Sequence, residues 1–83
     1  MVGEPELRHY EQAVAWRQEM LPLLRGALGK LDAASDRCPA SVEAVRLARA
    51  VKETRDLVKE CERSLTVARK MVIRERQRLK RNL

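Results

Sequence analysis

From Ser41 to the last residue the sequence holds neither glycine nor proline, and apolar residues recur there at every seventh position. The first row of this repeat is Ala44, Val51, Val58, Leu65, Val72 and Leu79. A companion row holds Leu47, Thr54, Cys61 and Ala68, and Glu75 interrupts it. An α-helix brings residues at this spacing onto one face. The sequence therefore predicts one long helix over about 41–80 that packs against another helix. Either Pro39 or Ser41 is expected to open it, with Glu43 near its positive end.

The segment 5–34 carries a similar repeat with a broader apolar stripe. Its rows are Leu7, Val14, Leu21 and Leu28, then Tyr10, Leu24 and Leu31, with Arg17 as an interruption, and the stripe is widened by Ala13, Trp16, Met20, Leu23 and Ala27. Pro22 lies in the middle of this segment and removes a helical hydrogen bond. We expect a kink there, with a break into two helices as the alternative. Gly26 and Gly29 weaken the second half by about 1 kcal/mol each relative to alanine.

The polar residues and the proline of the segment 35–40 predict a loop, since a proline disfavours helix at the residue before it. A connection this short makes the two helices antiparallel neighbours. The expected fold class is therefore all-α, an antiparallel helical hairpin that forms a single domain over 1–83. Helices of about 28 and about 40 residues would be roughly 42 and 60 Å long. The end of the second helix is thus expected to project beyond the hairpin.

Two helices cover each other on one side only, and a chain of 83 residues has little core to stabilise it. We expect a partner or self-association to complete a bundle. A three-helix monomer, broken at Pro22, is the alternative. The apolar residues expected to contact a partner are Trp16, Met20, Leu23, Leu47, Val51, Val58, Leu65 and Val72.

The net charge of +6 is concentrated at the C-terminal end. Residues 69–83 include seven lysines and arginines and one acid, whereas the eleven bases and eleven acids before them cancel. This end is a candidate contact for phosphates or for an acidic protein surface, although cations also suit the negative end of a helix dipole. The candidate residues are Arg74, Arg76, Arg78, Lys80 and Arg81.

Catalytic and metal-binding patterns are missing from the sequence. His9 is the only histidine, and Cys38 and Cys61 are too far apart for a paired metal-ligand motif. No glycine-rich phosphate loop follows an expected strand. We therefore expect no enzymatic activity, no cofactor and no metal. The two cysteines suit reduced thiols, and no apolar run approaches the length of a membrane span, which favours a cytoplasmic protein.

Three short motifs between Ala15 and Val58 carry a family resemblance. They are Arg17-Gln18 in the first expected helix, Cys38-Pro39 at the opening of the second, and Ala48-Arg49-Ala50 further on. In these the chain resembles the YscE/PscE-type co-chaperones of bacterial type III secretion. The resemblance implies a cytoplasmic helical hairpin that holds an aggregation-prone secretion subunit together with a second chaperone.

These observations favour a non-enzymatic protein–protein interaction module, either an adaptor or a small secretion co-chaperone, that binds a helical partner through its heptad face. One alternative is a hairpin dimer that binds nucleic acid through its basic C-terminal end. Another is a coiled-coil fragment of a larger scaffold protein, because no helix-stop signal precedes Leu83.

Overall fold

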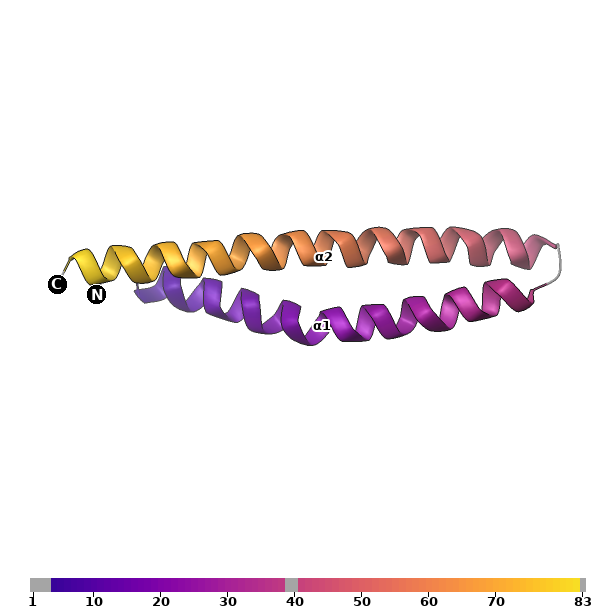
Figure 1. The fold of residues 1–83 in the computed structure, drawn as a ribbon, viewed down its shortest axis with the longest axis horizontal. Coiled ribbons are helices and arrows are strands. Elements are labelled where there is room, and N and C mark those ends of the chain that lie inside the picture. The colour runs from indigo at the N-terminus through magenta and orange to yellow at the C-terminus, as the bar shows by residue number, and fades with distance from the viewer. Residues whose placement is uncertain (1–3, 39–40, 83) are drawn as a thin grey trace.

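The computed structural model shows two antiparallel α-helices that lie side by side along almost their whole length (Figure 1). The structure describes residues 4–38 and 41–82. Helix α1 runs from Glu4 to Arg37 and helix α2 from Val42 to Arg81. The molecule is a rod of 64 × 14 × 14 Å. The predicted all-α helical hairpin is confirmed, and no strand occurs in the described ranges.

The first helix is longer than the sequence predicted. The predicted loop at 35–40 is wrong for Ser35, Asp36 and Arg37, which are helical. The N–H of Cys38 still donates to the carbonyl of Ser35, with 3.3 Å between nitrogen and oxygen. Proline restricts only the residue directly before it, so the helix continues up to that residue. The remaining residues of the predicted loop, Pro39 and Ala40, lie outside the described residues.

Helix α1 bends near Pro22 but does not break there. Its helical hydrogen bonding continues from Glu4 to Arg37 with Pro22 inside. In Figure 1 the ribbon changes direction near its middle, and both of its ends turn toward α2. Pro22 is exposed, so its ring lies on the outer side of the helix. The ring clashes with the carbonyl four residues back, and the helix curves away from that side. The expected kink of α1 is therefore found, and the alternative of a three-helix monomer broken at Pro22 is wrong.

Two glycines follow the bend. Gly26 and Gly29 are both helical and exposed, and a Cβ atom added at either position would meet nothing within 4 Å. No close approach in the hairpin requires them. They lower the intrinsic helix stability of this half of α1 without any compensating contact.

Helix α2 begins at a capped N-terminus. The backbone of Ser41 is extended, and its Oγ accepts a hydrogen bond from the N–H of Ala44 at 3.4 Å. Glu43 lies in the first turn, where its carboxylate accepts hydrogen bonds from its own backbone N–H and from the Ser41 hydroxyl. These two hydrogen bonds lower the pKa of Glu43 below its usual 4.5. Ser41, one of the two predicted starts, is thus the N-cap of the helix.

The interface between the helices is a narrow seam, which we define by its buried side chains. Among the residues whose burial is described, α2 contributes five and α1 contributes one: Leu21, Val51, Val58, Leu65, Ala68 and Val72. Leu21, Val58 and Leu65 form its centre, against which Val14, Leu24, Leu28 and Cys61 pack. Even Leu65, at 6% exposure, is not completely covered. The seven-residue row predicts this seam correctly, since four consecutive members of it are buried.

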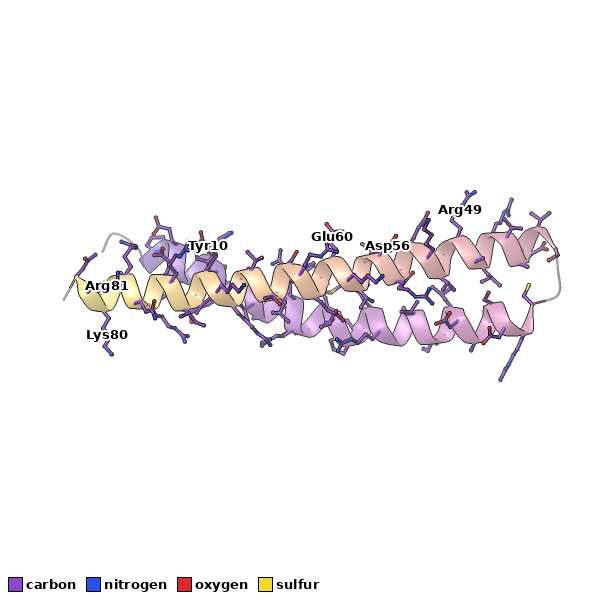
Figure 2. The ribbon with its side chains drawn as sticks, turned by 45° about the horizontal axis from the view of Figure 1, so that its top comes forward. Tyr10, Arg49, Asp56, Glu60, Lys80 and Arg81 are labelled. Atoms are coloured by element: carbon purple, nitrogen blue, oxygen red, sulfur yellow. The ribbon has the colours of Figure 1, made fainter. Side chains whose placement is uncertain are left out.

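The second helix projects less than the sequence predicted. Helix α2 has 40 residues and α1 has 34, a difference of six that corresponds to about 9 Å. Arg76 reaches Glu11 of α1, so this part of the basic end lies beside α1. Lys80 and Arg81 lie past the first described turn of α1 (Figure 2). The predicted overhang is therefore reduced to the last turns, because α1 extends to Arg37.

The substitution Val58→Asp tests the seam. It would place a carboxylate at a position that is 8% exposed and has no basic neighbour among the core residues. We expect a loss of more than about 2 kcal/mol in the free energy of unfolding, because apolar contact is lost and a charge is desolvated. Val67→Asp is the matched control, since Val67 is 58% exposed. Urea unfolding followed by circular dichroism measures both, and equal losses for the two variants would contradict the seam.

The substitution Ser41→Ala tests the cap of α2. Loss of the hydroxyl removes the acceptor for the Ala44 N–H and the donor to Glu43. We expect a loss of about 1 kcal/mol in the free energy of unfolding, and a rise in the pKa of Glu43 toward 4.5. The lowered pKa stabilises the fold above pH 4.5, and this contribution is lost as the pH falls through the folded-state pKa. NMR titration of Glu43 in both proteins measures the shift. A Glu43 pKa that does not change on substitution would exclude the hydrogen bond.

Candidate interaction surfaces

One long edge of the hairpin is crossed by ion pairs, and we call it the ion-pair edge. Three pairs join α1 to α2 there: Arg25–Glu62 at 2.9 Å, Asp32–Arg55 at 3.7 Å and Glu11–Arg76 at 3.6 Å. All six side chains are about half exposed, so each pair contributes at most about 1 kcal/mol. In each pair the two residue numbers add up to 87, so all three report the same register between the helices.

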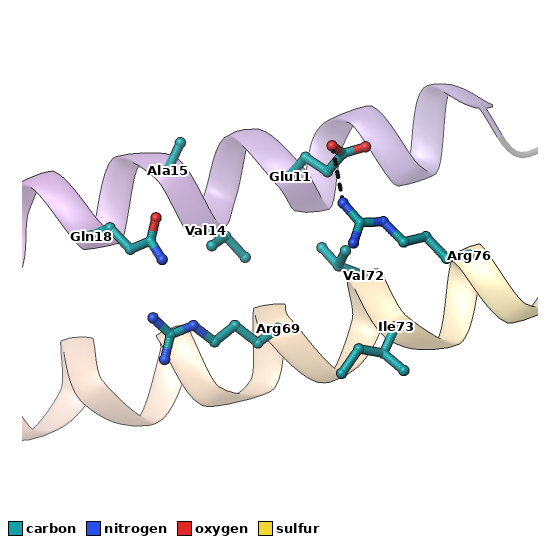
Figure 3. A pocket seen from close by; sticks show the side chains of 8 residues that line it. All are labelled: Glu11, Val14, Ala15, Gln18, Arg69, Val72, Ile73 and Arg76. Carbon is teal, nitrogen blue, oxygen red and sulfur yellow. Dashed lines mark ion pairs between the residues drawn. The ribbon is translucent and has the colours of Figure 1, made fainter.

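One position in this series lacks an ion pair. The same register places Gln18 opposite Arg69, between the pairs made by Glu11 and Arg25. Figure 3 shows the Gln18 and Arg69 side chains on opposite sides of a shallow groove, beside the Glu11–Arg76 pair. The groove has a volume of about 360 Å³, and Val14 and Val72 belong to its lining. Arg69 makes no ion pair within the described residues, because the opposing side chain is a neutral amide.

The opposite edge of the hairpin is apolar and open, and we call it the apolar edge. We define it by six side chains, three from each helix: Trp16, Met20, Leu23, Leu57, Val67 and Met71. One groove of about 280 Å³ brings Trp16 and Met20 together with Leu57. An adjoining groove of about 420 Å³ includes Val67 and Met71. Among the described residues no ion pair joins the helices along this edge.

The side chains of the apolar edge are unusually accessible for their size. Trp16 is 57% exposed, Leu23 67%, Leu57 51% and Val67 58%. Single exposed apolar residues are normal on a protein surface, but Trp16, Leu57 and Val67 line two adjoining grooves. A contiguous apolar group of this kind typically marks an interaction site. The narrow seam explains why these side chains are exposed, because each helix of the hairpin covers only one face of the other.

Arg17 separates the seam from the apolar edge. It occupies a seam position of α1 and is half-buried. Its guanidinium donates to the carbonyl of Ala13 at 3.2 Å and lies 5.7 Å from the centre of the Trp16 ring. The Cys61 thiol of α2 donates to the Arg17 carbonyl at 3.9 Å. The cation thus contacts the face of an exposed indole, an arrangement that favours one orientation of Trp16.

The predicted apolar partner contacts divide into two groups. Trp16 and Leu23 are exposed on the apolar edge and Met20 is half-buried there, whereas Leu47 is half-buried in the companion row of α2. The other four are buried in the seam: Val51, Val58, Leu65 and Val72. Their predicted role as partner contacts is corrected, because α1 of the same chain already covers them.

Three residues of the apolar edge were not among the predicted contacts: Leu57, Val67 and Met71. The sequence does contain a signal for two of them. Leu57 and Met71 each directly precede a seam valine, so they occupy the row beside the seam. The polar residue Ser64 lies between them in this row and interrupts its apolar repeat.

The basic C-terminal end is partly neutralised. Arg76 pairs with Glu11, and Arg78 donates to Glu75 at 2.8 and 3.1 Å. The hydrogen bonds from Arg78 and the negative charge of Glu75 raise the pKa of Arg78. The other three predicted contacts, Arg74, Lys80 and Arg81, are exposed and make no ion pair in the described ranges.

The described residues contain no group of three or more metal-ligating side chains. Cys38 and Cys61 are both free thiols and are half-buried. His9 is exposed and packs edge-on against Tyr10, with 5.6 Å between the ring centres. Neither described helix is long and apolar enough to cross a membrane.

The substitution Gln18→Glu tests the register of the ion-pair edge. A carboxylate at position 18 would face Arg69, and we expect a gain of about 0.5 kcal/mol in the free energy of unfolding at low salt. The gain should fall as added salt screens the pair. The matched control is the same substitution in an Arg69→Gln background, where the gain should disappear. An equal gain in both backgrounds, measured by urea unfolding, would exclude a direct pair.

The three comparisons with known proteins give no relative for this chain: no protein-family model matches it, nor does any curated protein or solved structure.

Proposed function

We propose that this chain is a non-enzymatic protein–protein interaction module that docks a helix of a partner onto its apolar edge. The observation that carries the proposal is the difference between the two edges of the hairpin. Three ion pairs cross one edge, whereas exposed Trp16, Leu57 and Val67 line the other. A hairpin that needed only to be stable on its own would gain from ion pairs or polar side chains on both edges.

The grooves of the apolar edge suit a helix in shape and chemistry. They lie between α1 and α2 and join end to end, since both include Arg17, Glu60 and Ser64. An amphipathic helix laid along such a groove would bury its apolar stripe and complete a three-helix bundle. Full burial of a large apolar side chain contributes about 1.5–3 kcal/mol, and tryptophan is a frequent centre of binding energy at interfaces.

This proposal replaces the heptad face of α2 with the apolar edge as the docking surface, because the heptad face is occupied by α1. It includes adaptors and small co-chaperones alike. A hairpin architecture agrees with the resemblance to the secretion co-chaperones, but many helical proteins share it. The nucleic-acid alternative has less support, because Arg76 and Arg78 are engaged in ion pairs.

The substitution Leu57→Asp tests the docking surface. Leu57 is 51% exposed, so we expect the hairpin to fold normally. A charge in the centre of the groove should nevertheless weaken partner binding at least about tenfold, since the groove would then desolvate a carboxylate. The measurement is quantitative cross-linking of the purified chain to proteins of the source cell, compared with the unsubstituted chain.

Val45→Asp is the matched control for Leu57→Asp. Val45 is a 64% exposed apolar residue of α2 that lines neither groove of the apolar edge. The control should retain every cross-linked partner. Loss of the same partners from both variants, or from neither, would contradict docking at this edge. If the chain binds duplex RNA or DNA and Leu57→Asp leaves this binding unchanged, the result would instead favour the basic C-terminal end as the binding surface.

A further inference from the structure

The shallow groove between Gln18 and Arg69 lies on the ion-pair edge, and the docking proposed at the apolar edge does not use it. We call it the Arg69 groove. Three charged side chains belong to its lining: Glu11, Arg69 and Arg76. Glu11 and Arg76 form an ion pair with each other at 3.6 Å. Among the described residues Arg69 has no ion-pair partner, so it carries the uncompensated positive charge of the lining.

Apolar side chains make up much of the remaining lining. Val72 is buried in the seam, Val14 packs against the centre of the seam, and Ile73 is 55% exposed. Ile73 follows Arg69 by one helical turn, so an exposed aliphatic side chain and an unpaired cation are neighbours on α2. An ion pair made beside apolar surface is screened less by water than one on an open face. The groove therefore favours an occupant that is both acidic and apolar.

The register of the ion-pair edge leaves Arg69 unpaired. On both sides of it the charges of the two helices compensate each other, in the ion pairs that Glu11 and Arg25 make with α2. At the intervening position α1 presents the neutral amide of Gln18 (Figure 3). No side-chain hydrogen bond joins Gln18 to Arg69 among the described residues. Both groups carry N–H donors, which suits an incoming oxygen acceptor between them.

We propose that the Arg69 groove binds an acidic segment of another protein. An aspartate or glutamate of that segment pairs with Arg69, and an aliphatic side chain one helical turn away packs on Ile73. Arg69 and Ile73 are about 6 Å apart along α2, and a partner helix presents its own side chains at the same spacing. A carboxylate accepts two parallel N–H bonds from a guanidinium, and the Gln18 amide offers a third donor. Because a shallow groove does not enclose its occupant as small-molecule sites do, the carboxylate belongs to a docked protein segment.

Two synthetic helical peptides test the inference with the full chain. Both contain a leucine, and one helical turn before it the acidic peptide has a glutamate where the neutral peptide has a glutamine. We expect the acidic peptide to bind at least about fivefold more tightly, because only the carboxylate pairs with Arg69, and the difference should fall with added salt. NMR titration measures both affinities. It also follows the side-chain N–H resonance of Arg69, which should shift with the acidic peptide alone.

Three variants test whether the recognised charge lies in the groove. Arg69→Gln removes the cation, and Gln18→Glu adds a carboxylate of the chain itself that competes with the peptide. Both should abolish the preference for the acidic peptide, although Gln18→Glu is expected to stabilise the hairpin. Arg74→Gln is the matched control, since Arg74 is also exposed and unpaired within the described ranges but does not line the groove. It should keep most of the preference. Equal losses from Arg69→Gln and Arg74→Gln would show that net charge governs binding, and would overturn the inference.

The remaining outcomes also decide the inference. Equal binding of the two peptides, or binding of neither at millimolar concentration, would overturn it. Loss of the preference in Leu57→Asp would place the peptide on the apolar edge, which would overturn the groove as the site while leaving the proposed docking function intact. If isocaproate, a free carboxylate with a leucine-like chain, binds as tightly as the acidic peptide and with the same dependence on Arg69, the groove is a small-molecule site. Self-association of the chain that Gln18→Glu abolishes would assign the groove to a second copy. Either result would overturn the proposed occupant.

Discussion

The hairpin depends on the contact between Leu21 of α1 and the buried row of α2 around Val58 and Leu65. This contact lies at the centre of the seam, and the other buried side chains continue the seam toward either end. The ion pairs on one edge fix the register but add little stability, because their side chains are about half exposed. Hydrophobic contact therefore holds the helices together, and charge determines how they are aligned.

The two edges beside this seam differ in chemistry. Two helices in contact leave two long edges, and the sequence treats them differently. One edge has acids and bases at matching heights on both helices. The other has an indole, a leucine and two methionines beside grooves that remain open. Since the contact itself demands no such difference, the difference is informative about binding, and it supports the function proposed above.

Much of the fold could be predicted from the sequence because heptad spacing translates directly into a helical face. The row containing Val51, Val58, Leu65 and Val72 is predicted without ambiguity, and all four are buried. The end of α1 was not predictable in the same way. Ser35 and Asp36 are frequent in turns, yet the helix retains them because only the residue before Pro39 is restricted.

The candidate site was less predictable than the fold. Apolar periodicity shows which side chains are expected to be buried, but it does not show whether the same chain or a partner buries them. Periodicity therefore predicts partner contacts for Val51, Val58 and Val72, although these valines are buried within the hairpin itself. The antiparallel pairing of the helices places Leu57 beside Trp16, and Val67 beside Tyr10. Such pairing joins residues that are far apart in the sequence, and periodicity within one helix does not report it.

The two glycines of α1 give the hairpin an uneven stiffness. Helix α2 runs 40 residues without a glycine or proline, whereas the α1 segment from Pro22 to Gly29 combines a missing hydrogen bond with two poor helix formers. Bending of α1 is therefore easiest in that segment, which contains Leu23 of the apolar edge and begins two residues after Met20. Helix α2 is therefore the stiffer of the two helices. Bending of α1 changes the width of the grooves of the apolar edge, while the side chains along α2 keep their spacing.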